Sequence, residues 1–529
     1  MEGEPAMKLT FLDISVFVAF FVVVVFVSMY KSRKEKTGEE YFLAGRGLLW
    51  PFIGLSLIAA NISSEHFVGM SGQSAGNVGL AIASYEWMAA ITLVVVAFFF
   101  LPKFLKSGIY TIPEFLEYRY NSAARGIMAF YTMVIYVGVT IASVLYSGAL
   151  ALKTIFGVSL GTAVWWIGAI AALYTIWGGL KAVAWADLFQ GSALIIGGAI
   201  VMIVGFVAVG GVPEFFRANG DKLHMILPAN HPILPWTALV IGLWIPNFYY
   251  WGLNQFICQR SLAAKSLRHG QLGVLFAAGL KLIIPFVIVI PGIMAFQLYR
   301  DQMTGPGGTF DAAYPLLIRN LIPVGIRGFM FAAIAGAVIS SLASMLNSAS
   351  TIFTLDLYKR YMKKDASQKS VVRMGRSMTL VFVLVGCLIA PLLGHPKLGG
   401  IFTYIQEFQG YISPGILAAF IFGLFVKRAP ARAGMVALLG NVPIYGLLHI
   451  FFSGAIPSVT VVKIAFLNRM AVTFALLLLI MAVMTLLRPL AEPVKLPVRE
   501  TFDMRPTPAV KYLGIAVVVI TICLYIIFW

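Results

Sequence analysis

Four polar side chains stand inside long apolar stretches of this chain: Glu86, Asn247, Lys281 and Gln406. Inside a membrane-like segment such groups are costly to bury, and most often they mark a binding site or an ion pathway. A carboxylate, an ammonium and two amides can donate to and accept from the several hydroxyls of a sugar. The set therefore favours a polyhydroxylated ligand, although a charge-neutralising pair of Glu86 with Lys281 is the structural alternative.

Two aromatic residues, Tyr250 and Trp251, closely follow Pro246. A sugar ring has an apolar C–H face that packs on an aromatic ring, and either residue could supply it. Aromatic residues of membrane proteins more often lie in belts at the lipid–water interface. The position of Tyr250 just after a helix-breaking proline favours the sugar contact for this residue.

Two adjacent hydroxyls, those of Ser340 and Ser341, lie in another apolar stretch. Serine in a membrane helix usually packs against a neighbouring helix. The two hydroxyls could instead join free carbonyls at a helix break, such as those of Ala59 and Ile62, in an all-oxygen shell for a small hard cation. Sodium is the cation that we expect there.

The elements that must position these groups are broken helices. Asn61–His66 is a polar interruption within an apolar stretch, and Trp244–Asn247, with its proline, is a second one. Broken membrane helices at corresponding places in two halves of a chain are typical of the binding site of a secondary transporter. Unwound backbone at membrane depth is tolerated only where protein or a wet cavity satisfies it.

The composition indicates a membrane protein. The 529 residues are 60% hydrophobic and 11% charged, with a mean hydropathy of +0.90. No polar stretch is long enough to fold as a soluble enzyme domain. Runs of about 18 or more apolar residues predict about 14 transmembrane helices, near residues 9–30, 50–71, 77–102, 122–152, 158–177, 183–209, 234–257, 270–298, 326–356, 374–394, 399–426, 431–453, 462–487 and 507–529.

We interpret the whole chain, 1–529, as a single membrane transporter domain. An extra N-terminal helix (9–30) precedes a first repeat at 50–209 and a second at 234–426, and C-terminal helices follow at 431–529. Because each repeat holds five helices, an odd number, the two repeats have opposite orientations in the membrane. The first helix has no small-residue cleavage site, so we expect it to be retained.

The net charge of +18 indicates an orientation in the membrane and not a nucleic-acid partner. With the N-terminus outside, the cytoplasmic loops hold most of the 39 Lys and Arg residues, as the positive-inside rule requires. We therefore expect a multi-pass protein of the plasma (inner) membrane that contacts the lipid bilayer, with both termini extracytoplasmic.

Six sequence motifs carry a likeness to a known family, and together they are specific. On them the chain resembles the sodium/solute symporter family, within it the sodium/glucose–galactose cotransporters, and most of all the bacterial members. The resemblance implies an all-α, LeuT-type five-plus-five inverted repeat with one extra helix before it and three after it. The motifs are Tyr41–Arg46, Ser56–His66, Ala83–Trp87, Asn247–Arg260, Ser340–Asn347 and Tyr404–Gln406.

The resemblance also implies roles for individual residues. Those implied to bind the sugar are His66, Glu86, Asn247, Tyr250, Lys281 and Gln406. Those implied to act as gates are Met70, Tyr85 and Phe402 on the outer side and Tyr250 on the inner side. Those implied to hold sodium are the carbonyls of Ala59, Ile62 and Ala337 and the hydroxyls of Ser340 and Ser341.

Three positions depart from the family pattern. His66 stands where bacterial galactose-transporting members have Gln and animal glucose transporters have His, and it can still donate to a sugar hydroxyl. Ala89 replaces a serine that helps to bind sugar. Ala343 lacks the hydroxyl found in members with a second sodium, which favours one sodium per sugar. If a second cation is bound, Asp187 is the residue that we suspect.

The sequence thus predicts a sodium-coupled symporter for a glucose- or galactose-type hexose that works by alternating access and is not an enzyme. A sodium/myo-inositol or other polyol symporter is the nearest alternative, because both ligands are hydroxylated rings. A sodium-dependent sugar sensor is a second, which the neutral amide of Gln406 disfavours. A carboxylate substrate would need an arginine at this site, and an ion channel would need a carboxylate ring or a filter; we find neither pattern.

Overall fold

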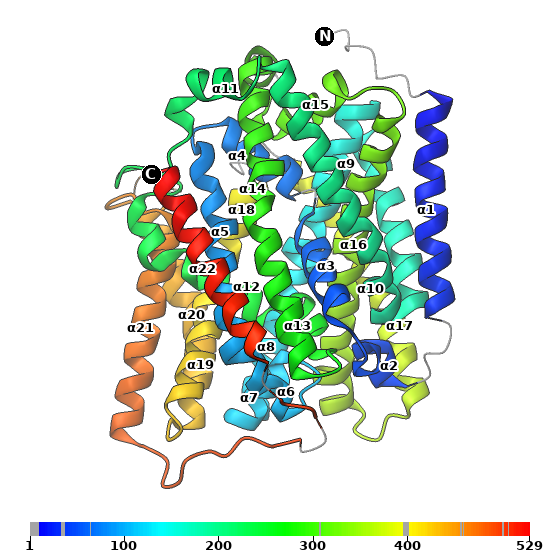
Figure 1. The fold of residues 1–529 in the computed structure, drawn as a ribbon. Coiled ribbons are helices and arrows are strands. Elements are labelled where there is room, and N and C mark those ends of the chain that lie inside the picture. Colours follow the sequence, from blue (N-terminus) through cyan, green and yellow to red (C-terminus); the bar gives the residue numbers. More distant parts are fainter. Residues whose placement is uncertain are drawn as a thin grey trace.

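The computed structural model describes residues 10–32, 37–63, 65–305, 308–394, 401–454, 458, 460–499, 502–505 and 507–529. Over these residues the chain is built from helices and loops, and the extended pairing found there is a bridge between Leu48 and Ala264. Figure 1 shows the long helices lying side by side in a bundle. This is the all-α architecture that the sequence predicted.

The helices of the first half are α1 (Phe11–Lys31), α2 (Gly38–Leu43), α3 (Trp50–Asn61), α4 (Ser71–Ala75), α5 (Ser84–Val95), α6 (Leu101–Ser107), α7 (Ile112–Arg119), α8 (Ser122–Ile135), α9 (Ile141–Phe156), α10 (Leu160–Ala208) and α11 (Val212–Ala218). Those of the second half are α12 (Trp244–Leu253), α13 (Gln255–Leu262), α14 (Leu267–Thr304), α15 (Ala313–Leu321), α16 (Ile326–Ile352), α17 (Gln368–Ile389), α18 (Ile401–Gln409), α19 (Ser413–Phe425), α20 (Ala431–Phe452), α21 (Phe466–Leu487) and α22 (Pro508–Ile527).

Short 3₁₀ or π-helical turns join or extend several of these helices. They are η1 (Ala44–Arg46), η2 (Glu65–Met70), η3 (Gly79–Ala83), η4 (Val96–Phe100), η5 (Tyr136–Thr140), η6 (Gly220–Lys222), η7 (Ala238–Gly242), η8 (Phe310–Ala312), η9 (Phe353–Met362) and η10 (Ala390–Gly394). Because π-helical turns often occur at functional sites, η2 and η7, beside the two predicted breaks, are of particular interest.

Ten helical segments in the described part of the chain are long and apolar enough to cross a membrane, and α18 with α19, bent by 46°, makes an eleventh. The other three predicted spans, near 50–71, 158–177 and 234–257, are short or interrupted. Each still has a helical counterpart, in α3 with η2, in the first part of α10, and in η7 with α12. The three differ because a polar or glycine-containing break divides the apolar run.

Two predicted spans, 158–177 and 183–209, are joined in α10 without a loop. The junction is at Gly179, whose φ is 52° inside the 49-residue run. Glycine adopts a positive φ without a steric penalty, so the two helices can meet directly at a kink. The sequence gives the two helices correctly, but it does not reveal this tight junction.

The core of the bundle lies around α16 and α14. In the segment Ile326–Met362, 89% of the apolar window is buried, and the value for α14 is 72%. The corresponding values for α1 and α22 are 17% and 22%. These two helices are therefore peripheral, and their outward apolar side chains face the surroundings of the bundle.

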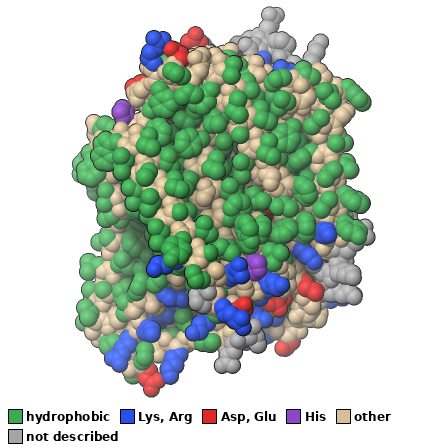
Figure 2. Space-filling view, in the orientation of Figure 1, with side chains coloured by type: hydrophobic (Ala, Val, Ile, Leu, Met, Phe, Trp, Pro, Cys, Tyr) green, Lys and Arg blue, Asp and Glu red, His purple; other side chains and the backbone are tan. Residues whose placement is uncertain are grey.

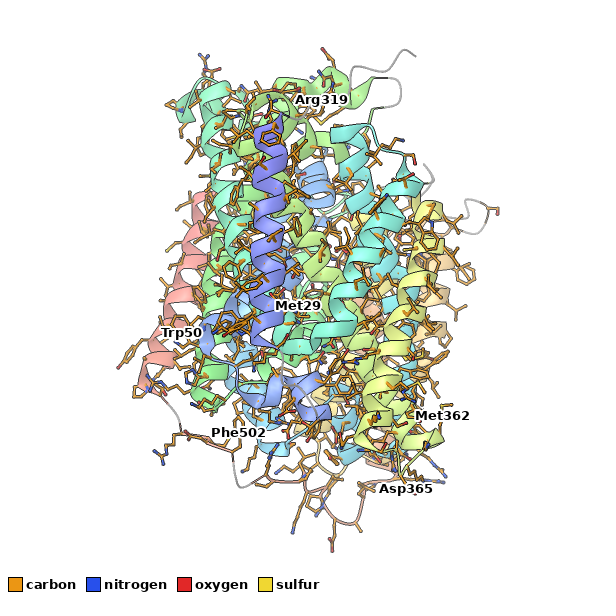
Figure 3. All side chains as sticks on the ribbon, turned by 90° about the vertical axis from the view of Figure 1, so that its right-hand side faces the viewer. Met29, Trp50, Arg319, Met362, Asp365 and Phe502 are labelled. Carbon is orange, nitrogen blue, oxygen red and sulfur yellow. The ribbon has the colours of Figure 1, made fainter. Side chains whose placement is uncertain are left out.

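The surface agrees with a protein that sits in a lipid bilayer. Figure 2 shows apolar side chains covering the middle and upper parts of one lateral face, with Lys and Arg gathered toward its lower end. Figure 3 places Arg319 at the upper end and Met362, Asp365 and Phe502 at the lower end. The lower end therefore carries the basic loop after η9 and the linker before α22.

Both ends of the described chain lie on the same side of the bundle. In Figure 1, α1 begins at the upper end and α22 rises from the lower end toward the segment that follows α11. There the backbone N–H of Met225 donates to the carbonyl of Phe528 at 2.9 Å. This arrangement requires an even number of crossings.

The first predicted break is present, but the second lies elsewhere. Helix α3 ends at Asn61, because Ile62 has an extended backbone (φ −76°, ψ 102°). At the second place, α12 runs without interruption through Asn247, and the extended residue is Asn254 (φ −81°, ψ 122°). Pro246 lies in the first turn of α12, where a missing N–H breaks no helical bond. The prediction of an unwound backbone at Asn247 is therefore wrong.

Candidate functional site

A buried ion pair lies where the first break meets the middle of the bundle. The ammonium of Lys281, on α14, is fully buried and contacts the carboxylate of Glu86 and the amide oxygen of Asn61. Nε2 of His66 lies 3.4 Å from Oε1 of Glu86. The ring of Trp251 lies 4.9 Å from Lys281 Nζ. We call Asn61, His66, Glu86 and Lys281 the lysine cluster.

The local sequence explains how these groups converge. Asn61 is the last residue of α3, and His66 follows in the π-helical turn η2. Glu86 lies in the first turn of α5, where a carboxylate also benefits from the positive end of the helix dipole. Lys281 comes from the middle of α14, so four separate segments meet at one point. The ion pair predicted as the structural alternative is therefore present, and it also borders a cavity.

A small cavity of about 50 Å³ opens beside the lysine cluster. Its volume is below the roughly 300–1,000 Å³ typical of small-molecule sites, so this form of the protein is closed around the space. A hexose would need the walls to move apart. The cavity is lined by Asn61, Glu65, His66, Met70, Tyr85, Glu86, Pro246, Asn247, Tyr250, Trp251, Phe402, Gln406 and Gln409.

All but one of the predicted sugar-binding and gating residues line this cavity. The exception is Lys281. It does not line the cavity itself, but it contacts Glu86 and Asn61, which do. The amide nitrogen of Asn247 donates to the carbonyl of Leu243 at 3.1 Å. The amide oxygen and the second N–H of Asn247 therefore stay available for a ligand. The structure therefore brings the predicted residues together around one cavity, and their roles stay predictions.

An aromatic contact closes one side of the cavity. The rings of Tyr85 and Phe402 meet edge to face with centroids 5.0 Å apart, and the side chain of Met70 is buried beside the cavity. Such edge-to-face pairs stabilise a closed arrangement by about 0.5–1.5 kcal/mol beyond their buried area. These are the three residues predicted as the outer gate, and that role stays a prediction.

Tyr250 also lines the cavity. Its hydroxyl accepts a hydrogen bond from Nδ2 of Asn61 at 3.0 Å, and its ring contacts those of Trp251 and Phe256 at 5.2 and 5.5 Å. Asn61 therefore bridges Tyr250, the predicted inner gate, and Lys281. A second, smaller cavity, lined partly by Asn61, Tyr250 and Gln409, lies adjacent to it.

Several buried polar atoms at the cavity have no hydrogen-bond partner in the described part of the chain. They are Oε1 of Glu65, Nδ1 of His66 and the hydroxyl of Tyr85. Buried polar atoms are nearly always paired, so such orphans indicate a ligand or water that completes them. A hydroxylated ring can both donate to Glu65 and accept from Tyr85.

Sequence reasoning assigned no role to Asn61, Glu65 or Gln409, although each lines the cavity. Asn61 and Glu65 belong to the polar interruption that the sequence singled out, and Gln409 lies three residues after the predicted Gln406. A spacing of three places two residues on one face of a helix. That periodicity was the signal that could have identified Gln409.

The predicted sodium ligands lie where the first break meets α16. The hydroxyl of Ser341 donates to the carbonyl of Ala60 at 3.1 Å, which is the residue between the predicted carbonyls of Ala59 and Ile62. The Ser340 hydroxyl contacts the carboxylate of Asp187 instead. Ala337 is fully buried one turn before the two serines. The Ser341 hydroxyl and the broken end of α3 are thus neighbours, and the ligand set stays a prediction.

A second buried ion pair lies next to these serines. Nη2 of Arg260, on α13, lies 3.1 Å from Oδ2 of Asp187, on α10, and both side chains are fully buried. Ser56 accepts from Arg260 Nε at 2.6 Å and contacts Asp187 as well. Ser344 also contacts Arg260. We call Ser56, Asp187, Arg260, Ser340 and Ser344 the aspartate cluster.

Comparison with known proteins places this chain in a family. Residues 41–440 match the model of the sodium:solute symporter family. The sodium/glucose cotransporter of Vibrio parahaemolyticus is 45% identical over 462 residues, 82% of this chain and 84% of that protein. The sodium/myo-inositol cotransporter 2 of Bos taurus is 35% identical over 472 residues, 83% of this chain and 70% of that protein.

The fold is also shared with a solved structure. A substrate-bound, outward-open Na⁺-coupled sialic acid symporter matches with a TM-score of 0.80 at 24% identity, over 92% of this chain and 100% of that chain. The likeness shows the fold, which is the LeuT-type arrangement predicted from the motifs.

Proposed function

This chain belongs to the sodium:solute symporter family, and on that basis we propose that it is a sodium-coupled symporter of glucose- or galactose-type hexoses that works by alternating access. The observation that carries the proposal is the buried carboxylate, ammonium and amide set beside a cavity with orphaned polar atoms. It is a multi-pass membrane protein, and transport by such a site requires no covalent chemistry.

The site recognises the sugar by hydrogen bonds and by packing against one aromatic ring. Glu86 accepts from ring hydroxyls, and the side chains of Gln406 and His66 can donate to them. Lys281 keeps Glu86 ionised and positioned. The ring of Tyr250 offers an apolar surface to the C–H face of the sugar, so its movement away from Asn61 would open the inner path.

Sodium stabilises the arrangement that the sugar needs. A cation held by the Ser340 and Ser341 hydroxyls with carbonyls of Ala59, Ile62 and Ala337 would pin the broken end of α3, and Asn61 lies at that end. Binding energy at one site therefore shapes the other, which is the thermodynamic requirement for coupling. One positive charge moved through 100 mV supplies roughly 2.3 kcal/mol to drive accumulation.

We infer one sodium per sugar, because Ala343 offers no hydroxyl for a second ion next to the serines. The sodium dependence of uptake should then show a Hill coefficient of about one. A coefficient of about two, with two charges per sugar, would contradict this stoichiometry and point to Asp187.

We place the protein in the plasma (inner) membrane with its lower end in the cytoplasm. The basic loop after η9 and the linker before α22 lie at that end, and positive loops favour the cytoplasmic side. Both termini are then extracytoplasmic. The repeats at 50–209 and 234–426 would be the two units that move relative to each other.

A myo-inositol or other polyol symporter is the second candidate. It is favoured by the likeness to a sodium/myo-inositol cotransporter at 35% identity, and inositol offers the same ring of hydroxyls. The likeness to a sodium/glucose cotransporter is stronger, at 45% identity, which is why a hexose stands first.

Uptake into proteoliposomes tests the proposal. Labelled glucose, galactose and myo-inositol are each offered with an inward sodium gradient, and then with potassium in its place. We expect uptake of a hexose that exceeds that of inositol and disappears without sodium. Uptake of inositol alone would support the second candidate, and sugar-dependent depolarisation without accumulation would indicate a sensor.

A further inference from the structure

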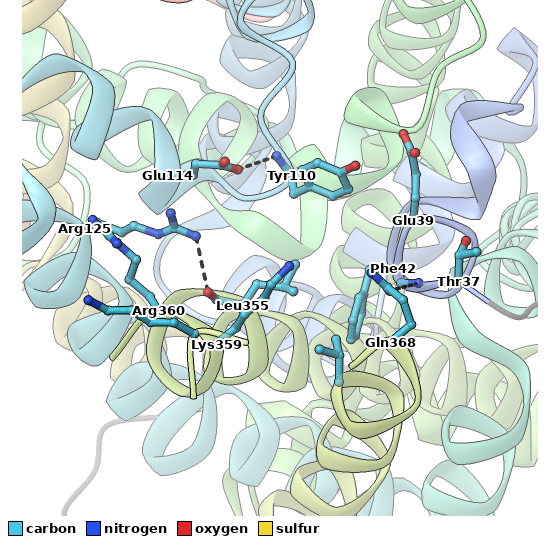
Figure 4. A pocket seen from close by; sticks show the side chains of 13 residues that line it. Thr37, Glu39, Phe42, Tyr110, Glu114, Arg125, Leu355, Lys359, Arg360 and Gln368 are labelled. Carbon is cyan, nitrogen blue, oxygen red and sulfur yellow. Dashed lines mark hydrogen bonds between the residues drawn. The ribbon is translucent and has the colours of Figure 1, made fainter. Parts of the chain in front are cut away.

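The largest cavity among those described lies far from the sugar site, at the lower end of the bundle. It has a volume of about 610 Å³, which is within the range of about 300–1,000 Å³ typical of small-molecule sites. Figure 4 shows its walls from close by. They come from α2 and its N-terminal residue Thr37, from the start of α7 and of α8, from η9, and from the start of α17.

The two opposite walls of this cavity differ in charge. In Figure 4, Glu114, Tyr110 and Glu39 lie along one side, and Lys359 and Arg360 lie along the other. Lys364 belongs to the same cavity and is exposed to solvent. A ligand with one anionic end and one neutral, hydroxylated end fits such a polarised space.

Most charged groups of the walls already have partners. Glu39 lies 3.0 Å from Nε of Arg46, and Glu114 accepts from the backbone N–H of Tyr110 at 2.7 Å. Arg125 is 2.8 Å from a carboxylate oxygen of Glu117. These contacts fix the walls, and they leave Glu114 charged, because a backbone N–H does not neutralise a carboxylate.

Glu117 stays anionic beneath the basic wall. Burial opposes its ionisation, but hydrogen bonds from Arg125 and Arg360 outweigh burial and hold the pKa of Glu117 below its ordinary value. The two arginines are therefore neutralised within the protein. The unneutralised positive charge of this wall belongs to the lysines.

Lys359 and Lys364 have no ion-pair or hydrogen-bond partner in the described part of the chain. Lys359 is half-buried, and in Figure 4 its ammonium points into the middle of the cavity. Basic residues in loops of membrane proteins usually reflect only which side of the membrane the loop faces. A half-buried ammonium that points into a cavity without a counter-ion is different, because it attracts an anion into a partly desolvated place.

The chemistry of the walls narrows the ligand. Glu39 on the far wall is paired with Arg46 and Arg499. The carboxylate of Glu114, however, has no ion pair in the described part of the chain and would repel a second anionic group, which disfavours polyphosphates. Both carboxylates can accept from hydroxyls, and the Tyr110 ring and the Phe42 side chain offer apolar surface. A single phosphate between Lys359 and Lys364, joined to a hydroxylated ring, satisfies both walls.

We propose that this cavity is a regulatory site for a phosphomonoester of a hydroxylated ring, such as a hexose phosphate or the headgroup of an anionic lipid. Its walls belong to α2, to α7 and α8 in the first predicted repeat, and to η9 and α17 in the second. A ligand that bridges them stabilises the arrangement in which the lower end is closed. Uptake from the opposite side is then slowed, and this consequence rests on the proposed function.

Direct binding tests the site without any transport. Glucose 6-phosphate is titrated calorimetrically into the purified protein in sodium-free buffer, where the sugar site is not ordered by its ion. We expect saturable binding that weakens about tenfold or more in Lys359→Gln/Lys364→Gln. The matched control is Lys363→Gln/Lys369→Gln, which removes the same charge from exposed residues outside the cavity and should bind as the wild type does.

Two comparisons identify the source of the phosphate. Nanodiscs with phosphatidylinositol 4-phosphate, whose headgroup is a phosphomonoester of a hydroxylated ring, are set against nanodiscs with phosphatidylcholine alone. They show whether a lipid headgroup displaces glucose 6-phosphate from the same lysines. Displacement assigns the site to lipid, and its absence assigns it to a soluble phosphomonoester. If neither ligand binds, or if the Lys359→Gln/Lys364→Gln variant binds both as tightly as the wild type, the proposal is wrong.

Uptake assays distinguish a failure of this proposal from a failure of the proposed function. Proteoliposomes loaded with glucose 6-phosphate at the lower face should take up sugar more slowly than empty ones, and the Lys359→Gln/Lys364→Gln variant should lose this difference. Binding without transport of any sugar would refute the symporter and leave the site. Transport of a hexose without phosphate binding would refute the site and leave the symporter.

Discussion

The lysine cluster and the aspartate cluster are both buried ion pairs attached to α3, yet they differ in how completely they are satisfied. Both oxygens of Asp187 are bonded within the protein, one by Ser340 and the other by Ser56 and Arg260. Glu86 also has partners, but the cavity beside it retains orphaned atoms on Glu65 and His66.

This difference separates a structural ion pair from a binding one. A buried pair whose charged groups are fully bonded holds elements together, here α3, α10, α13 and α16, and its carboxylate has no unpaired oxygen left for a sugar. The hydroxyl oxygen of Ser340 still has a lone pair for the proposed sodium. Where an ion pair borders a cavity and its neighbours have unpaired polar atoms, ligand hydroxyls can form hydrogen bonds to those atoms. We therefore expect changes in the aspartate cluster to affect folding first, and changes around the lysine cluster to affect sugar binding.

The largest effect is expected for Arg260→Met. The substitution leaves Asp187 buried without its cation, which costs about 3–5 kcal/mol of folding free energy. Thermal unfolding in detergent should show a large loss of stability or no folded protein. The double variant Arg260→Met/Asp187→Asn removes both charges and should recover much of the loss. If the single variant unfolds at the temperature of the wild type, the aspartate cluster is not structural.

Lys281→Ala comes next and should affect both properties. It leaves Glu86 without its ammonium, but water from the cavity, a proton or His66 can stabilise that carboxylate. The loss of stability should therefore be smaller than for Arg260→Met, at about several kcal/mol or less, while sugar binding is abolished. Thermal unfolding and sugar binding are measured on the same preparation, with Lys511→Ala, exposed at the start of α22, as the control. Unaltered binding would exclude Lys281 from the site.

The lysine cluster could be predicted from the sequence because its members are polar residues inside apolar runs. Glu86, Lys281 and Gln406 stand out in this way, and the hydropathy pattern needs no tertiary information to reveal them. The fold class follows from the same pattern, since apolar runs of this length form membrane helices.

The aspartate cluster could not be predicted in this way. The last apolar run before Arg260 ends near residue 257, so this arginine was assigned to a loop, whereas α13 buries it completely. Its partner Asp187 lies 73 residues away in sequence. No local pattern reports a contact between such distant residues, and a charge near the end of an apolar run is normally a topology signal.

The second break was misplaced for a related reason. Proline suggested an interruption at Trp244–Asn247, but its effect depends on its position in the helix, and Pro246 lies in the first turn of α12. The extended residue is Asn254, eight positions later. A sequence shows which residue can break a helix, and only the helix boundary shows whether it does.

Ser341→Ala tests the proposed sodium site, which lies between the two clusters. The hydroxyl lies against the broken end of α3 through Ala60, and alanine keeps the helix. If Ser341 is a sodium ligand, the sodium concentration for half-maximal uptake should rise about tenfold, while sugar affinity at saturating sodium changes little. Ser348→Ala is the control: this buried hydroxyl of α16 bonds Gln259 instead. An unchanged sodium curve would remove Ser341 from the cation site.

Gln406→Ala is expected to have the smallest effect, and it isolates the ligand role from the structural one. The side chain lines the proposed sugar cavity and belongs to neither ion pair, so its removal leaves no charge unpaired. Each neutral hydrogen bond lost to the sugar costs about 0.5–1.5 kcal/mol, and the apparent sugar constant should rise roughly tenfold. The unfolding temperature and the sodium dependence should stay as in the wild type. If hexose affinity is unchanged in Gln406→Ala and Lys281→Ala is harmless, the cavity is not the sugar site, and the distinction between the two clusters fails with it.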